Sequence, residues 1–128
     1  MIGKNDPNVI AILDWELSTL GDPCADFNYH CLQYIMNPKL ADEDYCRNQG
    51  IPVIDEYVKM YSEKINVDLT EEWDLYSAYN LFKLAGILQG ILGRVRDGTA
   101  AHENAAERAS GVRNLSDKAW DLVKKNFL

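Results

Sequence analysis

The sequence has few of the residues that build disulfide frameworks and structural zinc sites: three cysteines and two histidines among 128 residues. No two cysteines form a Cys-x-x-Cys pair, and neither histidine lies at zinc-site spacing from them, so we expect neither kind of site. Cys24 and Cys31 are seven residues apart and share one face of a helix, which predicts small buried apolar side chains and not reactive thiols. His30 and His102 fit no Ser-His-Asp or Cys-His arrangement, and we expect structural or exposed roles for both.

Basic residues are in the minority, and long apolar runs are missing. Thirteen lysines and arginines against twenty acids give a net charge of −7, and the isoelectric point is near 4.7. Such a surface repels nucleic acids and anionic membranes. No apolar run approaches the roughly 20 residues that cross a bilayer. The sequence therefore predicts a soluble, cytoplasmic chain of one domain, with no nucleic-acid or membrane partner.

Helical signals dominate the rest of the chain and predict a mainly α fold. Asp22 is a good N-cap and Pro23 a good first helical residue, because proline has no N–H to leave unpaired there. Periodic apolar positions and turn signals predict helices over about 23–36, 41–48, 53–65, 71–95 and 101–127, the last with a break around Gly111.

The helix over 71–95 is expected to be the central core helix, because apolar residues recur along it at helical spacing. Three glycines interrupt it, and we expect each to admit a closely approaching backbone: Gly86, Gly90 and Gly93. Aromatic residues at helical spacing are expected in the core: Tyr57, Tyr61, Trp73, Tyr76, Tyr79 and Phe82.

An apolar segment over residues 9–13 precedes Asp14. Its β-branched run without alternation predicts a strand buried on both faces. The turn over residues 5–8 would make it one arm of a short N-terminal β-hairpin. Two interpretations of Asp14 stay open at this point. It ends the strand and caps a turn, or it holds a divalent cation that bridges nucleotide phosphates.

The stretch AILDWELSTLGDPCADF, residues 11–27, resembles the aminoglycoside phosphotransferase and choline kinase-like family. The resemblance is strongest to the branch fused to acyl-CoA dehydrogenases, where Asp-Trp-Glu precedes a GDPxxD element. It continues in GIPVIDEYV, residues 50–58, and in YNLFKLAGILQGILGRVRDGTA, residues 79–100. It implies an ATP-dependent kinase that phosphorylates a small-molecule hydroxyl, and a two-lobed kinase-like fold. Residues 1–128 would form one partial domain, the helical part of the C-terminal lobe.

The resemblance also implies roles for single residues. Asp14 would match the family's Mg²⁺-binding acid, and Trp15 and Glu16 would complete the local motif with no assigned chemical role. The GDPxxD element contributes Gly21, Asp22, Pro23 and Asp26. A structural role is favoured for Asp22, which would cap the next helix and brace the catalytic loop. For Asp26 the structural and functional roles both stay open.

The sequence departs from the family pattern because it contains no His-Gly-Asp catalytic loop and no nucleotide-covering lobe. We therefore expect the chain to be inactive alone and to bind Mg²⁺ and ATP weakly or not at all. Arg94 and Arg96 either meet an anionic substrate or serve surface solubility. Apolar surface and a strand edge normally covered by missing parts would favour a homodimer. The alternative is a helical binding or oligomerisation module that has lost catalysis.

Overall fold

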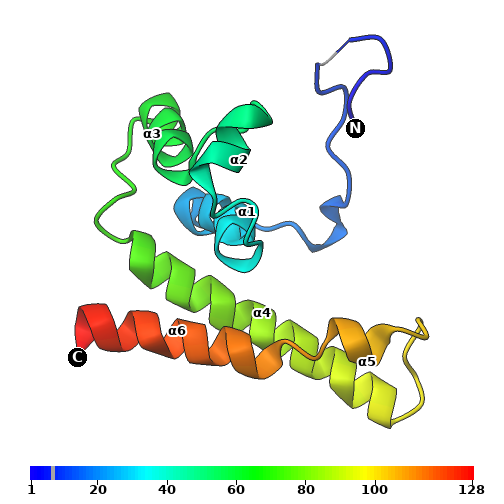
Figure 1. Ribbon diagram of the computed structural model, residues 1–128. Coiled ribbons are helices and arrows are strands. Elements are labelled where there is room, and N and C mark those ends of the chain that lie inside the picture. The colour runs from blue at the N-terminus through cyan, green and yellow to red at the C-terminus, as the bar shows by residue number, and fades with distance from the viewer. Residues whose placement is uncertain (7) are drawn as a thin grey trace.

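The computed structural model describes residues 1–6 and 8–128, and for Leu17, Arg108 and Phe127 the backbone alone. Over these residues the chain is mainly α, as predicted (Figure 1). The third residue of the predicted 5–8 turn, Pro7, lies outside the described residues. In chain order the elements are η1 (Trp15–Leu17), α1 (Pro23–Met36), α2 (Glu43–Asn48), α3 (Ile54–Ile65), α4 (Trp73–Arg96), α5 (Ala105–Arg108) and α6 (Val112–Phe127).

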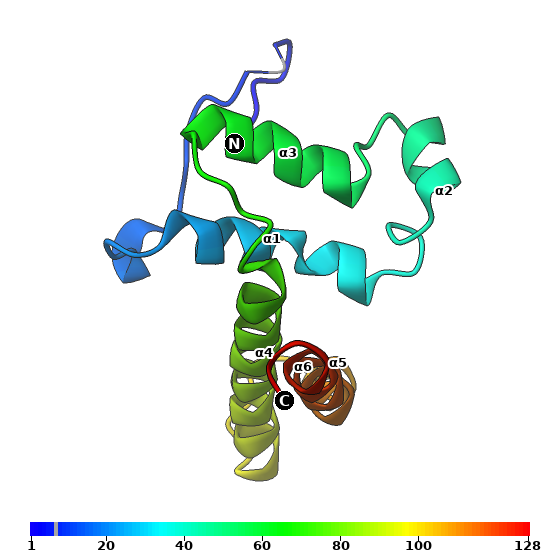
Figure 2. The ribbon, with the colours of Figure 1, turned by 90° about the vertical axis from the view of Figure 1, so that its left-hand side faces the viewer.

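The helices form two groups that meet along α4. Helices α1, α2 and α3 lie together at the N-terminal end of α4, and α6 runs antiparallel beside it (Figures 1 and 2). One apolar cluster joins α1, α3 and the α3–α4 connection, with Phe27, Cys31, Val58 and Leu69 buried in it. A second cluster joins α1, α4 and α6 around Leu81, which is fully buried. Helix α4 is therefore the central helix that the apolar periodicity predicts.

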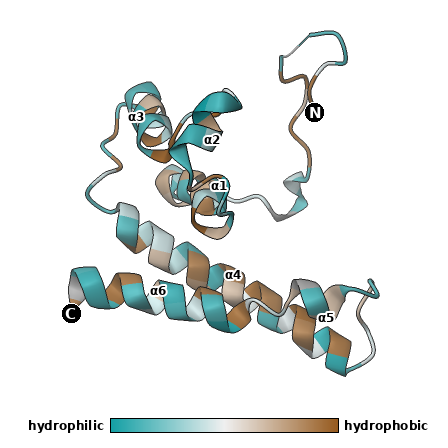
Figure 3. Ribbon diagram, viewed as in Figure 1, coloured by the Kyte–Doolittle hydropathy of each residue, from teal (hydrophilic) through white to brown (hydrophobic). Residues whose placement is uncertain are grey.

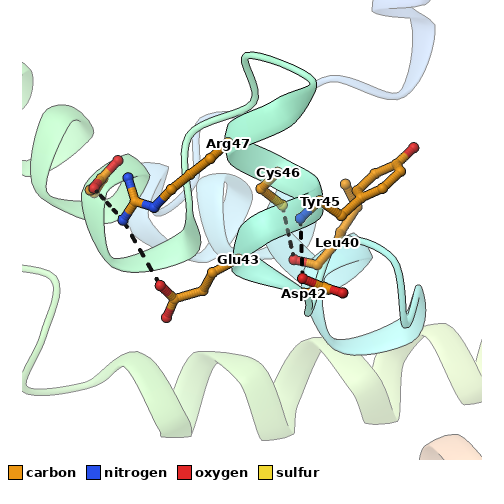
Figure 4. Close-up of polar contacts among 7 residues, drawn as sticks. Leu40, Asp42, Glu43, Tyr45, Cys46 and Arg47 are labelled. Atoms are coloured by element: carbon orange, nitrogen blue, oxygen red, sulfur yellow. Dashed lines mark hydrogen bonds and ion pairs between the residues drawn. The ribbon is translucent and has the colours of Figure 1, made fainter.

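Local signals set the helix boundaries. Asp42 caps α2 by accepting a hydrogen bond from the Tyr45 backbone N–H at 3.1 Å. Figure 4 shows this cap together with the ion pair of Arg47 and Glu43, at 3.9 Å. Arg47 also pairs with Glu56 at 3.0 Å, which joins α2 to α3. Gly98 ends α4 in the left-handed conformation, at φ 71°, where a glycine costs least.

The segment before Asp14 differs from the prediction. Among the described residues, Ile2 and Val9 form one isolated antiparallel bridge. The predicted hairpin is therefore reduced to this bridge, without two full strands. Residues 9–13 form no strand, and Val9, Ile12 and Leu13 are each more than 60% exposed. Figure 3 shows this apolar stretch standing away from the helices. The prediction of a strand buried on both faces is wrong, because no described element covers the segment.

Two expectations for α4 are also wrong. A Cβ built on Gly86 or Gly93 would meet no atom within 4 Å, and one on Gly90 would meet only Arg94 Nη1, at 3.9 Å. No described backbone approaches these glycines. Tyr79 and Phe82 are 55% and 70% exposed and lie outside the core. The other predicted aromatics do pack in the first cluster, where the Phe27 and Tyr61 rings stack at 3.8 Å between centroids.

Among the described helices, none is both long and apolar enough to cross a bilayer. The cysteines are buried and free, which confirms the interpretation of Cys24 and Cys31 as apolar packing residues. Burial raises the pKa of the Cys31 thiol to about 12, because the thiolate loses hydration in an apolar site.

Thiol labelling tests this packing. In native buffer near pH 8, we expect Ellman's reagent to leave Cys24, Cys31 and Cys46 largely unreacted, because only the thiolate attacks and the sulfur atoms are enclosed. In denaturing urea all three should react within minutes. Fast labelling of a native thiol would contradict the packing of these residues.

Candidate functional site

The turn around Asp14 is built by local hydrogen bonds. Trp15 Nε1–H donates to the Ile12 carbonyl at 2.7 Å, and the Ser18 hydroxyl donates to the Trp15 carbonyl at 2.7 Å. Asp14 itself lies in the left-handed region, at φ 70° and ψ 47°. Asp tolerates this conformation better than most residues, but it is uncommon and costs energy. The turn therefore holds Asp14 in a defined and mildly strained backbone conformation.

The Asp14 side chain is exposed and makes no capping hydrogen bond to η1. The prediction of a carboxylate that closes a buried strand is thus wrong, and so is the turn-capping role. Within residues 1–6 and 8–128, no three His, Cys, Asp or Glu side chains gather closely enough to hold a metal ion. Asp14 can offer one ligand to a cation, and the remaining ligands would have to come from elsewhere.

Asp22 connects the motif to the helical core. It caps α1 by accepting hydrogen bonds from the backbone N–H groups of Cys24 (2.8 Å) and Ala25 (3.4 Å). Its other carboxylate oxygen accepts a hydrogen bond from the Tyr76 hydroxyl of α4, at 2.6 Å. The Tyr76 hydroxyl and the Cys24 N–H stabilise the charged carboxylate and lower the pKa of Asp22. The predicted capping role of Asp22 is confirmed, and Asp22 also joins the start of α1 to α4 through Tyr76.

The remaining motif residues lie around this joint. Pro23 is the first residue of α1, as predicted. Gly21 precedes the cap in an open position, with no atom within 4 Å of a built Cβ. Asp26 is exposed in the first turn of α1, where its charge favours the helix dipole. Glu16 is exposed on η1. The structure thus groups residues 21–26 at one helix start, with Asp14 on the exposed turn before it.

A buried polar network beside this joint escaped the sequence analysis. Asn28 of α1 donates to the Ser77 hydroxyl at 2.9 Å, and Asn80 donates to Asn28 Oδ1 at 3.0 Å. Asn80 also donates to the Ala25 carbonyl at 2.8 Å. Asn28, Ser77 and Asn80 are each 1% exposed. Their positions on apolar helix faces were the available signal, since buried amides are retained where partners satisfy them.

Arg94 and Arg96 lie far from this group. Both belong to the last turn of α4, which is distant from η1 in Figures 1 and 2. Arg96 pairs with Asp97 at 3.2 Å, and both side chains are largely exposed. The structure does not bring the two arginines together with Asp14.

A hollow of about 780 Å³ lies elsewhere, between α3, the α3–α4 connection, the start of α4 and the end of α6. Trp73 and acidic side chains line it, among them Asp55, Asp68 and Asp74. A smaller, more apolar hollow of about 440 Å³ adjoins it where α1, α4 and α6 meet. None of the predicted site residues lines either hollow.

Comparisons with known proteins show that the chain is similar in sequence to part of several much longer proteins. It is 37% identical over 123 residues to acyl-CoA dehydrogenase family member 10 of Mus musculus, a match that covers 91% of this chain and 11% of that protein. It is 33% identical over 123 residues to acyl-CoA dehydrogenase family member 11 of Homo sapiens, covering 93% of this chain and 16% of the relative. A probable acyl-CoA dehydrogenase of Arabidopsis thaliana, IBR3, is 33% identical over 128 residues, or 94% of this chain and 15% of the relative.

The chain is similar to one part of acyl-CoA dehydrogenase family proteins. This finding confirms the predicted link to proteins of that name. The chain spans only 11–16% of the length of these three relatives. No family model and no solved structure matches it.

The buried network predicts a large effect of a small change. Asn80→Ala removes the donor from which Asn28 Oδ1 and the Ala25 carbonyl accept, and the Asn28 oxygen is buried, so we expect a loss of about 1–3 kcal/mol in unfolding free energy. Urea denaturation measures this loss. Asn114→Ala, at an exposed position of α6, is the control and should change stability by less than about 0.5 kcal/mol. Equal effects of the two variants would contradict a structural role for the network.

The Asp22–Tyr76 hydrogen bond predicts a pH-dependent effect. The folded pKa of Asp22 lies below its ordinary value of 3.8. Its stabilising effect is therefore complete well above pH 3.8 and is lost as the pH falls through the lower folded pKa. Tyr76→Phe should lower the melting temperature at neutral pH, and the difference from the wild type should shrink toward about pH 3. Tyr79→Phe is the matched control, and a Tyr76→Phe deficit that stays constant with pH would refute the coupling.

Proposed function

We propose that this chain is the helical part of the C-terminal lobe of an ATP-dependent small-molecule kinase related to the aminoglycoside phosphotransferases. The whole enzyme would transfer the γ-phosphate of ATP to a substrate hydroxyl. The observation that carries the proposal is the Asp14 turn, which presents one carboxylate in a constrained backbone conformation beside a helix start. The acyl-CoA dehydrogenase names of the relatives favour a hydroxyacyl acceptor over an antibiotic.

Asp14 is the residue that we assign to the cation. Magnesium in phosphotransferases is usually bound through one or two carboxylates together with substrate phosphates and waters, so a single exposed acid fits as one ligand of a shared site. When bound, the ion neutralises phosphate charge. The described residues do not form a complete magnesium site, so Asp14 alone cannot hold the ion in catalytic geometry.

The helical core serves this function by positioning. Asp22 anchors the GDPxxD element to both α1 and α4, and the buried amide network fixes those two helices against each other. Seven residues lie between this anchor and Asp14. Phosphoryl transfer depends on several positioned groups at once, and the sequence contains no His-Gly-Asp loop. We therefore propose that the chain has no kinase activity by itself.

The second candidate is a helical binding or oligomerisation module without catalysis. One observation favours it: buried residues of α1, α3, α4 and α6 form two apolar clusters within this chain. In this alternative the Asp14 motif is a remnant whose remaining role is to lead into the α1 cap.

A titration distinguishes the two candidates. We expect the purified chain to bind Mg²⁺–ATP weakly, and Asp14→Ala to weaken binding about tenfold or more, because one of few ligands is lost. Isothermal calorimetry or magnesium-dependent changes in amide NMR spectra provide the measurement. Asp117→Ala, an exposed acid on α6, serves as the control.

Identical binding by the wild type, Asp14→Ala and Asp117→Ala would remove the metal assignment. No binding by any of the three would mean that these residues alone offer no cation site. In either case Asp14→Ala should lower the melting temperature only modestly, because the replaced side chain is exposed and the cost is that of an alanine in the left-handed conformation.

A further inference from the structure

One face of α4 is apolar and uncovered. Leu75, Tyr79 and Phe82 follow each other at spacings of four and three, so they lie along one side of the helix. They are 45%, 55% and 70% exposed. Figure 2 shows α5 and α6 along one side of α4, while the buried face of α4 meets α1 and α6 through Leu81 and Ala85. A soluble chain rarely leaves aromatic side chains in a row without a partner.

The same face continues into bare backbone. Gly86, Gly90 and Gly93 follow Phe82 at helical spacing, and the space beside them is open to at least 3.9 Å. Large side chains therefore project from the N-terminal half of this face. The C-terminal half carries glycines in line with them, so its surface is recessed. A surface with both features can fit a copy of itself turned by 180°.

We infer that this face, which we call the α4 face (Leu75, Tyr79, Phe82, Gly86, Gly90 and Gly93), binds the α4 face of a second copy in an antiparallel homodimer. A two-fold axis at Gly86 places Phe82 of one protomer opposite the partner's Gly90. The same axis places Tyr79 opposite the partner's Gly93. Each aromatic side chain then fills the space that a glycine leaves, and two glycines meet at the axis, where the backbones come closest.

Charge favours the antiparallel orientation. The start of α4 is acidic, with Glu71 and Glu72 just before it and Asp74 in its first turn, and its last turn is basic, with Arg94 and Arg96. Antiparallel pairing sets the acidic end of each helix beside the basic end of the other, and it also opposes the helix dipoles favourably. A parallel pair would put like charges together and would stack aromatic against aromatic.

This inference relocates the predicted homodimer. The sequence predicted association through apolar surface and a strand edge, and among the described N-terminal residues the Ile2–Val9 bridge is the extent of the strand pairing. Association through α4 uses a rigid, preformed surface instead. It does not depend on phosphotransfer.

Sedimentation equilibrium of the full chain, over about 1–200 μM at physiological salt, tests the dimer. We expect a concentration-dependent dimer for the wild type, with Phe82→Glu raising the dissociation constant about tenfold or more. Trp120→Glu, at a 55% exposed aromatic position of α6, is the matched control and should leave it unchanged. Ile10→Glu, in the exposed N-terminal segment, should also leave it unchanged if the strand edges do not pair.

Gly90→Leu separates association from folding. The added Cβ would meet only the flexible end of Arg94 within the protomer, at 3.9 Å, so circular dichroism should show an unchanged fold. The leucine would fill the space proposed for the partner's Phe82, so the dimer should weaken. For orientation, Phe82→Cys and Gly90→Cys proteins should cross-link on oxidation when mixed, and each much less alone. A wild type that stays monomeric over this concentration range would overturn the inference. So would equal effects of Phe82→Glu and Trp120→Glu on the dissociation constant, or efficient cross-linking of Phe82→Cys with itself.

Discussion

The hydrogen bonds between the buried amides of α1 and α4 are the constraint on which the other features depend. An apolar interface alone tolerates small shifts, because dispersion and burial are not directional. Asn28, Ser77 and Asn80 remove that freedom, since a shift of one residue would strand amide groups where water cannot reach. With the register of α1 against α4 fixed, Asp22 and Tyr76 come within hydrogen-bonding distance. The start of α1, and with it the GDPxxD element, is held in one place.

Most of the helical framework could be predicted because its signals are local. The cap at Asp22 and the proline after it act within a few residues of the chain, and both lie where the sequence indicates. The central position of α4 follows from its apolar period. The mainly α fold therefore needs no knowledge of which helix packs on which.

The errors share one physical cause. An apolar run over residues 9–13, three glycines in α4 and the aromatic pair Tyr79 and Phe82 all suggest close neighbours. A sequence pattern indicates that an apolar surface is suited to burial, but it does not indicate whether another segment of this chain covers that surface. The buried network was missed because its hydrogen bonds join two helices. The role of Asn28 and Asn80 becomes visible only when the packing of α1 against α4 is known. For the candidate site, the motif and the Asp22 cap were predictable, whereas the left-handed backbone of Asp14 and its distance from Arg94 were not.

The three tryptophans occupy very different surroundings, and this gives the molecule a built-in optical probe. Trp15 and Trp120 are 63% and 55% exposed, so their indole emission already resembles that of water-exposed rings in the folded chain. Trp73 is partly buried against the cluster of Phe27 and lies 6.1 Å from its ring. A change in the emission spectrum on denaturation would therefore come chiefly from Trp73, and it would report the separation of α1 from the start of α4.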